Sequence, residues 1–185
     1  MKRLFFYLLL PLLITFNAQG QNEKYTIYKH GGKVYKTNRY VRKTGFLKFK
    51  SDNNSYELPY LELDSIVSYE KNKKSKKIEP VVQMFIPISK KQGALMRVVE
   101  RGKCTLFLWR YALGGGTSTN YYAYREGERT PKLIATRDLI SPLNFIKDTS
   151  EYFSDCEALV AKIKNKDFKK KETPEMVRFY NTECN

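Results

Sequence analysis

The chain has 185 residues, which is enough for one domain or two small ones. Hydrophobic residues make up 42% and charged residues 29%, so the composition allows a packed core and excludes a globally disordered chain. One histidine and three scattered cysteines exclude a zinc site made from the usual His and Cys ligands, and the sequence predicts no metal and no cofactor. The formal net charge of +15 points to anionic surroundings but names no ligand and no oligomeric state.

Residues 1–20 have the pattern of a secretory signal peptide. Lys2 and Arg3 precede an apolar run over residues 4–16, which is shorter than the about 20 residues of a membrane-spanning helix. Small residues stand three and one positions before a cut after Gly20, so we expect cleavage there. The first cysteine after the run is Cys104, which argues against a lipoprotein anchor. We therefore expect an exported protein, periplasmic or extracellular, with no membrane-spanning segment after cleavage and with outer-membrane association as one option.

Residues 21–70 predict an N-terminal β region of short strands. Strands are expected over 25–29, 33–40, 46–50, 56–58 and 61–69, and a Gly-Gly pair supplies the first hairpin turn. This repeated order of glycine, short strand and polar turn is typical of a strongly bent sheet or a partial barrel.

Residues 71–79 predict a Lys-rich linker or loop. Its like charges repel one another and bury nothing, so we expect a mobile segment. Its cations are also the candidate contacts to an anionic surface: Lys71, Lys73, Lys74, Lys76 and Lys77.

Residues 80–140 predict an antiparallel meander, and residues 141–185 a helical tail. Meander strands are expected over 81–88, 94–100, 103–112, 121–125 and 133–134, with a hairpin tip over 114–119. In the tail, the pattern predicts helix starts at Ser141-Pro142, at a capping box of Ser154 and Glu157, and at Thr173-Pro174. The expected fold class is α+β: an antiparallel β-rich body, meander or partial barrel, with a short helical C-terminal tail.

Four short motifs stand out in the second half of the chain. They are Gly102-Lys103-Cys104, Tyr121-Tyr122, Tyr152-Phe153-Ser154-Asp155-Cys156 and Phe179-Tyr180-Asn181. In this arrangement the chain resembles small exported proteins of Bacteroidetes bacteria. The resemblance implies export from a Gram-negative cell, and it implies neither an activity nor a catalytic residue.

The sequence predicts no catalytic residue and favours a non-enzymatic protein. A hydrolase with a catalytic histidine would depend on His30 alone, which lies in an expected hairpin turn, and no Gly-x-Ser-x-Gly motif accompanies it. The glycine-rich segment 114–119 lacks the lysine of a phosphate-binding loop. The hydrolase is therefore the second alternative and the less supported one.

Cations and aromatic rings alternate between residues 33 and 50, which is the combination found in sites for single-stranded nucleic acid or glycans. The cations are Lys33, Lys36, Arg39, Arg42, Lys43, Lys48 and Lys50, and the rings are Tyr35, Tyr40, Phe46 and Phe49. Export makes nucleic acid a poor physiological partner. The alternative function is thus a binding module for anionic envelope lipids or polysaccharide, and the competing interpretation is a solvated face over an aromatic core.

Three cysteines in an oxidising compartment predict one disulfide and one leftover thiol. Cys104 lies in an expected strand and has the character of a small core residue. Cys156 and Cys184 both lie in the tail, so we expect them to pair. Two alternatives stay open: a Cys104–Cys156 bridge, or a free and reactive Cys156 at a helix N-terminus.

Overall fold

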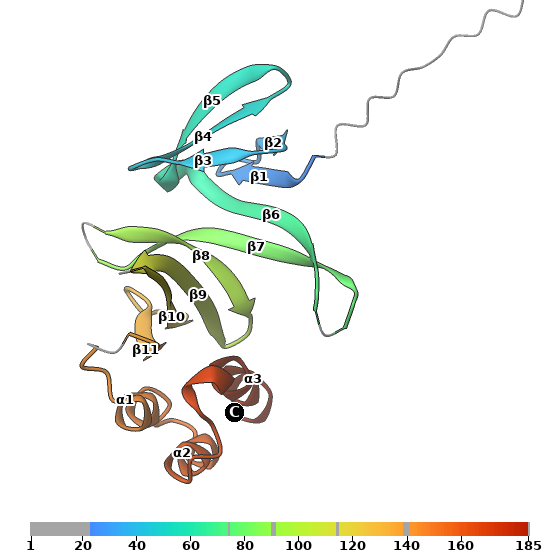
Figure 1. Cartoon of the computed structure of the whole chain (residues 1–185). Helices are drawn as coiled ribbons and strands as arrows, with labels where there is room; N and C mark the ends of the chain where they lie inside the picture. Colours follow the sequence, from blue (N-terminus) through green and yellow to red (C-terminus); the bar gives the residue numbers. More distant parts are fainter. Residues whose placement is uncertain (1–22, 74, 90–91, 114, 139–140, 185) are drawn as a thin grey trace, which may run out of the picture.

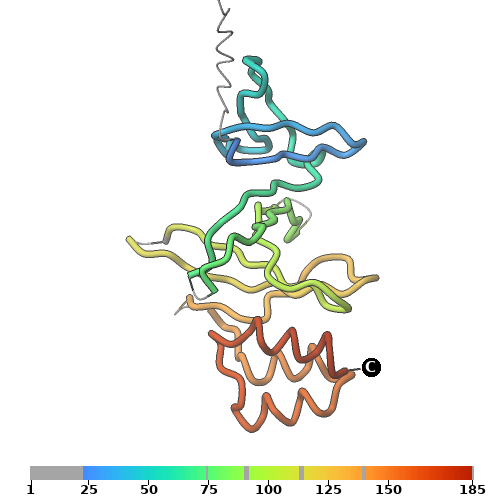
Figure 2. The backbone as a smooth tube through the Cα atoms, turned by 90° about the vertical axis from the view of Figure 1, so that its right-hand side faces the viewer, coloured from blue at the N-terminus to red at the C-terminus, as the bar shows by residue number. Residues whose placement is uncertain are grey.

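The structure is a computed structural model that describes residues 23–73, 75–89, 92–113, 115–138 and 141–184. The expected signal peptide and Lys74 lie outside the described residues. The rest of the molecule is arranged in three tiers: a small β unit at one end, a long sheet across the middle and three helices at the other end (Figures 1 and 2). No helix of these residues is long and apolar enough to cross a membrane.

Eight antiparallel strands form the main sheet. They are β1 (Tyr25–Lys29), β2 (Val34–Thr37), β6 (Leu63–Lys71), β7 (Ile78–Pro87), β8 (Gly93–Glu100), β9 (Cys104–Leu113), β10 (Gly116–Arg125) and β11 (Lys132–Thr136). Their order is β11-β10-β9-β8-β7-β6-β1-β2, so strands from both expected β regions share one sheet. The antiparallel β-rich body predicted from the sequence is confirmed, with a meander running from β6 to β11.

A second sheet of three strands covers the β1–β2 end of the main sheet. It contains β3 (Tyr40–Arg42), β4 (Phe46–Ser51) and β5 (Asn54–Pro59) in that order, and the 3-10 turn η1 (Tyr60–Glu62) leads on to β6. Asp52 and Asn53 have φ values of 47° and 64°, as a tight two-residue hairpin turn requires. Side chains of the two sheets share one core, made of Ile27, Tyr35, Leu47, Phe49, Leu58, Leu63, Ile66 and Leu95.

The Lys-rich segment is the turn of the β6–β7 hairpin, and the sheet continues on both sides of it. Lys71 is opposite Ile78 in the ladder. Within the turn, the Asn72 side chain donates to Glu79 Oε2 at 2.7 Å, and the Ser75 hydroxyl donates to Glu79 Oε1 at 3.0 Å. These two hydrogen bonds hold the pKa of Glu79 below its ordinary value. Of the two expected alternatives, a linker or a loop, the segment is the loop of a hairpin, because the pairing of β6 with β7 decides the path of the chain here.

The hairpin tip between β9 and β10 is shorter than the sequence pattern predicts. Gly116 already pairs with Leu113, and the ladder continues through Thr117 and Ser118. Threonine and serine are compatible with strands, and here the cross-strand register to β9 includes them in β10. The residues expected as a flexible tip over 114–119 are thus mostly strand.

Three helices cover one face of the sheet between β8 and β11. They are α1 (Phe145–Tyr152), α2 (Glu157–Lys164) and α3 (Thr173–Glu183), and the 3-10 turn η2 (Lys170–Glu172) precedes the last. The core beneath them contains Leu106, Ala123 and Ile134 from the sheet and Phe153, Leu159, Ile163, Met176 and Val177 from the tail. The short helical C-terminal tail is confirmed.

Two of the three predicted helix starts are wrong. The N-cap of α1 is Asn144, whose side chain accepts from the backbone N–H of Lys147 at 3.1 Å, and not Ser141. The residue before α2 is Cys156, and no side chain caps it, so Ser154 and Glu157 do not form the expected capping box. At α1 the cap is still a local one but lies three residues further along the chain, and before α2 the N-cap position is taken by Cys156, which the disulfide ties to Cys184. The start of α3 at Thr173 agrees with the prediction.

The opposite face of the same strands carries a smaller apolar cluster. Met96, Phe107 and Tyr122 are buried there, and Trp109 and Tyr124 are half-buried beside them. The Trp109 and Tyr122 rings lie 6.4 Å apart, so packing across strands accounts for this aromatic stripe.

Candidate functional site

A hollow of about 540 Å³ opens on the surface of the three-stranded sheet, and we call it the first hollow. It lies where the β2–β3 connection meets β4 and the β4–β5 turn. Its lining residues are Lys36, Thr37, Asn38, Arg39, Val41, Lys48, Phe49, Lys50, Ser51, Asp52, Asn53 and Ser55. Four of them are cations and one is an acid, so the lining has a net positive charge.

Strand alternation explains why cations gather on this surface. Along β4, Leu47, Phe49 and Ser51 are buried, and Lys48 and Lys50 between them are exposed. Pairing places Val41 opposite Lys48, so the outer face combines an exposed apolar side chain with lysines. Lys36 of β2 and Arg39 of the β2–β3 connection line the same hollow.

Two of the four cations in the first hollow are already paired with carboxylates. Lys36 Nζ lies 3.2 Å from Glu23 Oε2, and Lys48 Nζ lies 2.9 Å from Glu57 Oε1. Arg39 and Lys50 are exposed, and neither forms an ion pair with any residue in the described part of the chain. The one acid of the lining, Asp52, accepts a hydrogen bond from the Ser51 hydroxyl at 3.2 Å. Arg39 and Lys50 are therefore the charges available to an anionic ligand.

Uncharged polar side chains in the first hollow are also available to a ligand. Asn38, Asn53 and Ser55 are exposed, and within the described residues none of their side chains makes a hydrogen bond to the protein. Thr37 differs, because its hydroxyl donates to the Arg39 carbonyl at 2.9 Å and fixes the β2–β3 connection. The hollow thus offers two unpaired cations, two amides and one hydroxyl around the apolar surface of Val41.

A second hollow of about 660 Å³ adjoins the first and shares three lining residues with it. The shared residues are Asn38, Arg39 and Val41, and the others are Lys24, Tyr25, Tyr40 and Arg42. The Tyr25 and Tyr40 rings meet edge to face at 4.9 Å, and both are half-buried. The Arg42 guanidinium donates to Gln83 Oε1 at 2.9 Å and ties the small sheet to β7.

The structure brings together most of the cations that alternate with aromatic rings in the sequence. Lys36, Arg39, Lys48 and Lys50 line the first hollow, and Arg42 lines the second. Lys33 instead lies over the Tyr35 and Tyr56 rings at 5.1 and 5.8 Å, and Lys43 lines neither hollow. Of the four aromatic rings, Tyr35 and Phe49 belong to the core, and Phe49 also lines the first hollow. Sequence reasoning found the cations but missed Asn38, Asn53 and Ser55, which have the ordinary signature of turn residues.

The lysines expected to contact an anionic surface are placed elsewhere. Lys71 is at the end of β6, and Lys73, Lys76 and Lys77 are exposed on the β6–β7 turn. None of these four lines either hollow, and Lys74 lies outside the described residues.

The lone histidine lies near a carboxylate and a serine hydroxyl, but the hydrogen bonds among these three residues do not follow the pattern of a catalytic triad. His30 Nδ1 lies 3.9 Å from Asp64 Oδ1, and the Ser65 hydroxyl donates to Asp64 Oδ2 at 2.8 Å. A nucleophilic serine must instead hydrogen-bond to the imidazole, which removes its proton. His30 is also 62% exposed, and nearby Glu62 is engaged by Lys29 at 2.6 Å.

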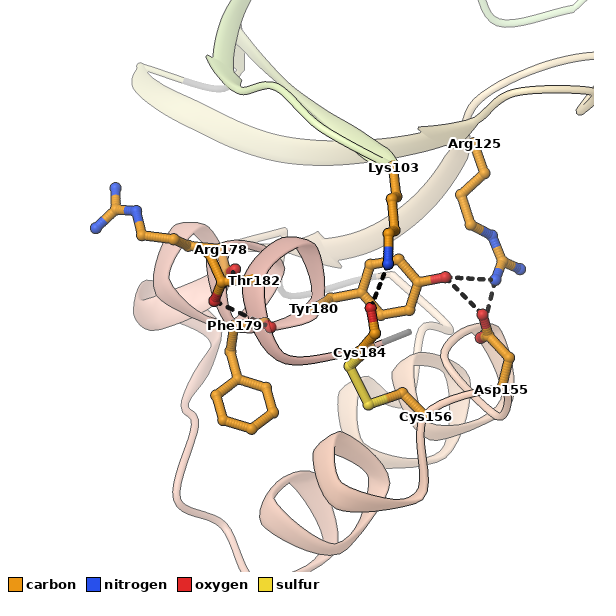
Figure 3. The surroundings of a disulfide bond; sticks show 9 residues. All are labelled: Lys103, Arg125, Asp155, Cys156, Arg178, Phe179, Tyr180, Thr182 and Cys184. Carbon is orange, nitrogen blue, oxygen red and sulfur yellow. Dashed lines mark hydrogen bonds and ion pairs between the residues drawn. A yellow bond between two sulfur atoms is a disulfide. The ribbon is translucent and has the colours of Figure 1, made fainter.

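A second group of charged residues joins the sheet to the helices (Figure 3). Arg125 Nη1 donates to Asp155 Oδ1 at 2.9 Å, and the Tyr180 hydroxyl donates to Asp155 Oδ2 at 2.5 Å. The Arg125 guanidinium also lies 4.5 Å from the centre of the Tyr152 ring. Because these groups satisfy one another, we interpret this junction as structural.

The disulfide beside this junction agrees with the sequence prediction. Cys156 is bonded to Cys184 with their Cα atoms 5.6 Å apart, and Lys103 Nζ donates to the Cys184 carbonyl at 2.5 Å (Figure 3). Cys104 is the free and buried cysteine, as expected. Burial raises the pKa of its thiol to about 11, so the thiol stays protonated at neutral pH.

Comparisons with known proteins found no relative of this chain. No family model, no curated protein and no solved structure matches the chain.

Proposed function

We propose that this is an exported, non-enzymatic binding protein that recognises anionic groups of envelope glycans or lipid headgroups in the first hollow. One observation carries the proposal: Arg39 and Lys50 line the same hollow and have no carboxylate partner among the described residues. An unpaired cation on a protein surface is stabilised by an anionic ligand at little desolvation cost. The side-chain amides of Asn38 and Asn53 can donate and accept hydrogen bonds to the ligand, which a surface that carries only charges cannot do.

Two further observations support export and an anionic envelope partner. The Cys156–Cys184 disulfide is typical of a protein from an oxidising compartment, which favours glycans and lipids over nucleic acid. The signal-like pattern of residues 1–20 agrees with that location.

The test is retention on an immobilised acidic polymer, heparin, as the salt concentration is raised. We expect the unmodified protein to be retained at low salt, and the Arg39→Ala/Lys50→Ala double variant to elute at clearly lower salt. The matched control removes the same charge elsewhere, at Lys43 and Lys73, which are exposed and line neither hollow. Equal elution of the double variant and the control pair would show that net charge alone causes retention, and it would contradict a site in the first hollow.

A further inference from the structure

The two hollows form one continuous surface that is too long for a compact headgroup. Asn38, Arg39 and Val41 line both hollows, and cations stand on each side of them: Lys50 in the first hollow and Lys24 in the second. Strands lie about 4.8 Å apart, so the first hollow, which reaches from Val41 in β3 to Ser55 in β5, already spans about 10 Å. The second hollow extends the surface from β3 to Lys24 and Tyr25. A single phosphate or carboxylate placed at Lys50 would leave the second hollow empty.

We propose that the ligand is a linear acidic polysaccharide that crosses β3 and places acidic sugar residues in both hollows. This inference rests on the proposed function and names its ligand class. Arg39 is the cation common to both hollows, Lys50 contacts the polymer on one side, and Lys24 contacts it on the other. The repeated negative charges of such a polymer match this line of separated cations. Each added contact also releases counterions from the polymer, which favours binding, as for other linear polyanions.

The uncharged groups of the surface favour a sugar chain over an acidic peptide. The side chains of Asn38, Asn53 and Ser55 have no hydrogen-bond partner among the described residues, and sugar hydroxyls both donate and accept hydrogen bonds at every unit. Val41 is 39% exposed, and the half-buried Tyr25 and Tyr40 rings lie in the second hollow, so apolar surface is available to sugar rings. An acidic peptide supplies carboxylates but lacks hydroxyls along its backbone.

The experiment compares a galacturonate trimer with a galacturonate dodecamer by calorimetry, using the protein with its disulfide intact. We expect the dodecamer to bind about tenfold more tightly than the trimer, because the second hollow is filled intramolecularly. Lys50→Ala should weaken both ligands. Lys24→Ala should remove most of the gain of the dodecamer and leave trimer binding unchanged, whereas Lys43→Ala should change neither ligand.

The Lys24→Ala variant distinguishes two causes of tighter binding by the dodecamer. A longer polymer gains affinity simply because it can place any of its sugar units in the first hollow, and that part of the gain does not depend on Lys24. Only a second contact in the second hollow depends on Lys24. A dodecamer gain that survives Lys24→Ala would therefore overturn the extended site. If the trimer still bound through Lys50 in that case, the proposed function would stand, and if no anionic probe bound at all, the proposed function would fail as well.

Two competing ligands complete the test. Polyglutamate of matched charge should bind more weakly than the dodecamer, and equal binding would show recognition of charge without the sugar. Phosphatidylglycerol vesicles should bind more weakly too, and tighter binding to vesicles, independent of Lys24, would assign the surface to a membrane.

Discussion

Asn181 holds the backbone of Cys104 with both polar atoms of its side-chain amide. Its Oδ1 accepts from the Cys104 N–H at 2.8 Å, and its Nδ2 donates to the Cys104 carbonyl at 2.9 Å. A neighbouring strand would make the same pair of bonds, so α3 substitutes here for a strand beside the start of β9. The contact fixes the helical tail to the sheet on the same side as the disulfide.

Gly102 is predicted to be essential for that contact. A Cβ at this position would lie 2.6 Å from Asn181 Cγ, so Gly102→Ala must displace the amide and break both bonds. We expect a loss of about 1–3 kcal/mol in the free energy of unfolding, the cost of leaving buried polar groups unpaired. Urea denaturation measures it. Asn181→Ala is the control: in the double variant the two losses should not add, and full additivity would show that Gly102 acts elsewhere.

The disulfide should make a large contribution to stability. It closes a loop of 28 positions, and its loss typically costs about 2–5 kcal/mol. Reduction by dithiothreitol should therefore lower the melting temperature of the unmodified protein and leave the Cys156→Ser/Cys184→Ser variant unaffected. Equal melting temperatures with and without reductant would contradict a stabilising bridge.

Acid should weaken the junction at Asp155. Burial alone would raise its pKa, but the hydrogen bond from Tyr180 and the charge of Arg125 outweigh burial and hold the pKa below its ordinary value. The ionised carboxylate therefore stabilises the fold above about pH 4, the unfolded value, and this contribution disappears as the pH falls through the lower folded pKa. The effect is small, because the side chain is 48% exposed and solvent screens it.

Two variants measure that contribution. Asp155→Asn should be less stable than the unmodified protein at pH 7, and the difference in unfolding free energy should shrink below about pH 4. Tyr180→Phe removes the donated hydrogen bond and should reduce the same pH dependence. A difference that stays constant from pH 7 to pH 2 would exclude this electrostatic role.

The lysines of the β6–β7 turn should matter little for stability. Lys73, Lys76 and Lys77 are exposed, and exposed charges contribute less than about 1 kcal/mol each. We expect the triple change to glutamine to leave the melting temperature nearly unchanged and to weaken anion binding only at low salt. A large fall in melting temperature would show that these side chains hold the hairpin turn.

Local signals predicted the elements whose geometry is decided by neighbours in sequence. The Gly31-Gly32 turn has φ values of 87° and 89°, and Thr173 begins α3 with proline in its first turn. At α1 two local signals competed, and Asn144, not Ser141, caps the helix. The other failure occurred where pairing with a neighbouring strand decides, because the ladder to β9 makes Gly116 part of a strand.

The candidate site could be predicted only in part for the same reason. Alternation along β4 indicates that Lys48 and Lys50 share an exposed face. Nothing local, however, indicates that Asn38 and Asn53 line one hollow with them, because they belong to connections that only the β3–β4–β5 register brings together. The joining of two hollows at Arg39 depends on the same register.

The most direct test of the anion site is a titration of the isotopically labelled protein with galacturonate oligomers, followed by the backbone amide resonances in NMR spectra. We predict that the largest shifts occur at residues 36–41 and 48–55, and that the dodecamer adds shifts at residues 24, 25 and 42. Shifts concentrated on residues 73 and 75–77 of the β6–β7 turn, or on the lysines at 164–171 of the tail, would contradict a binding site in the first hollow.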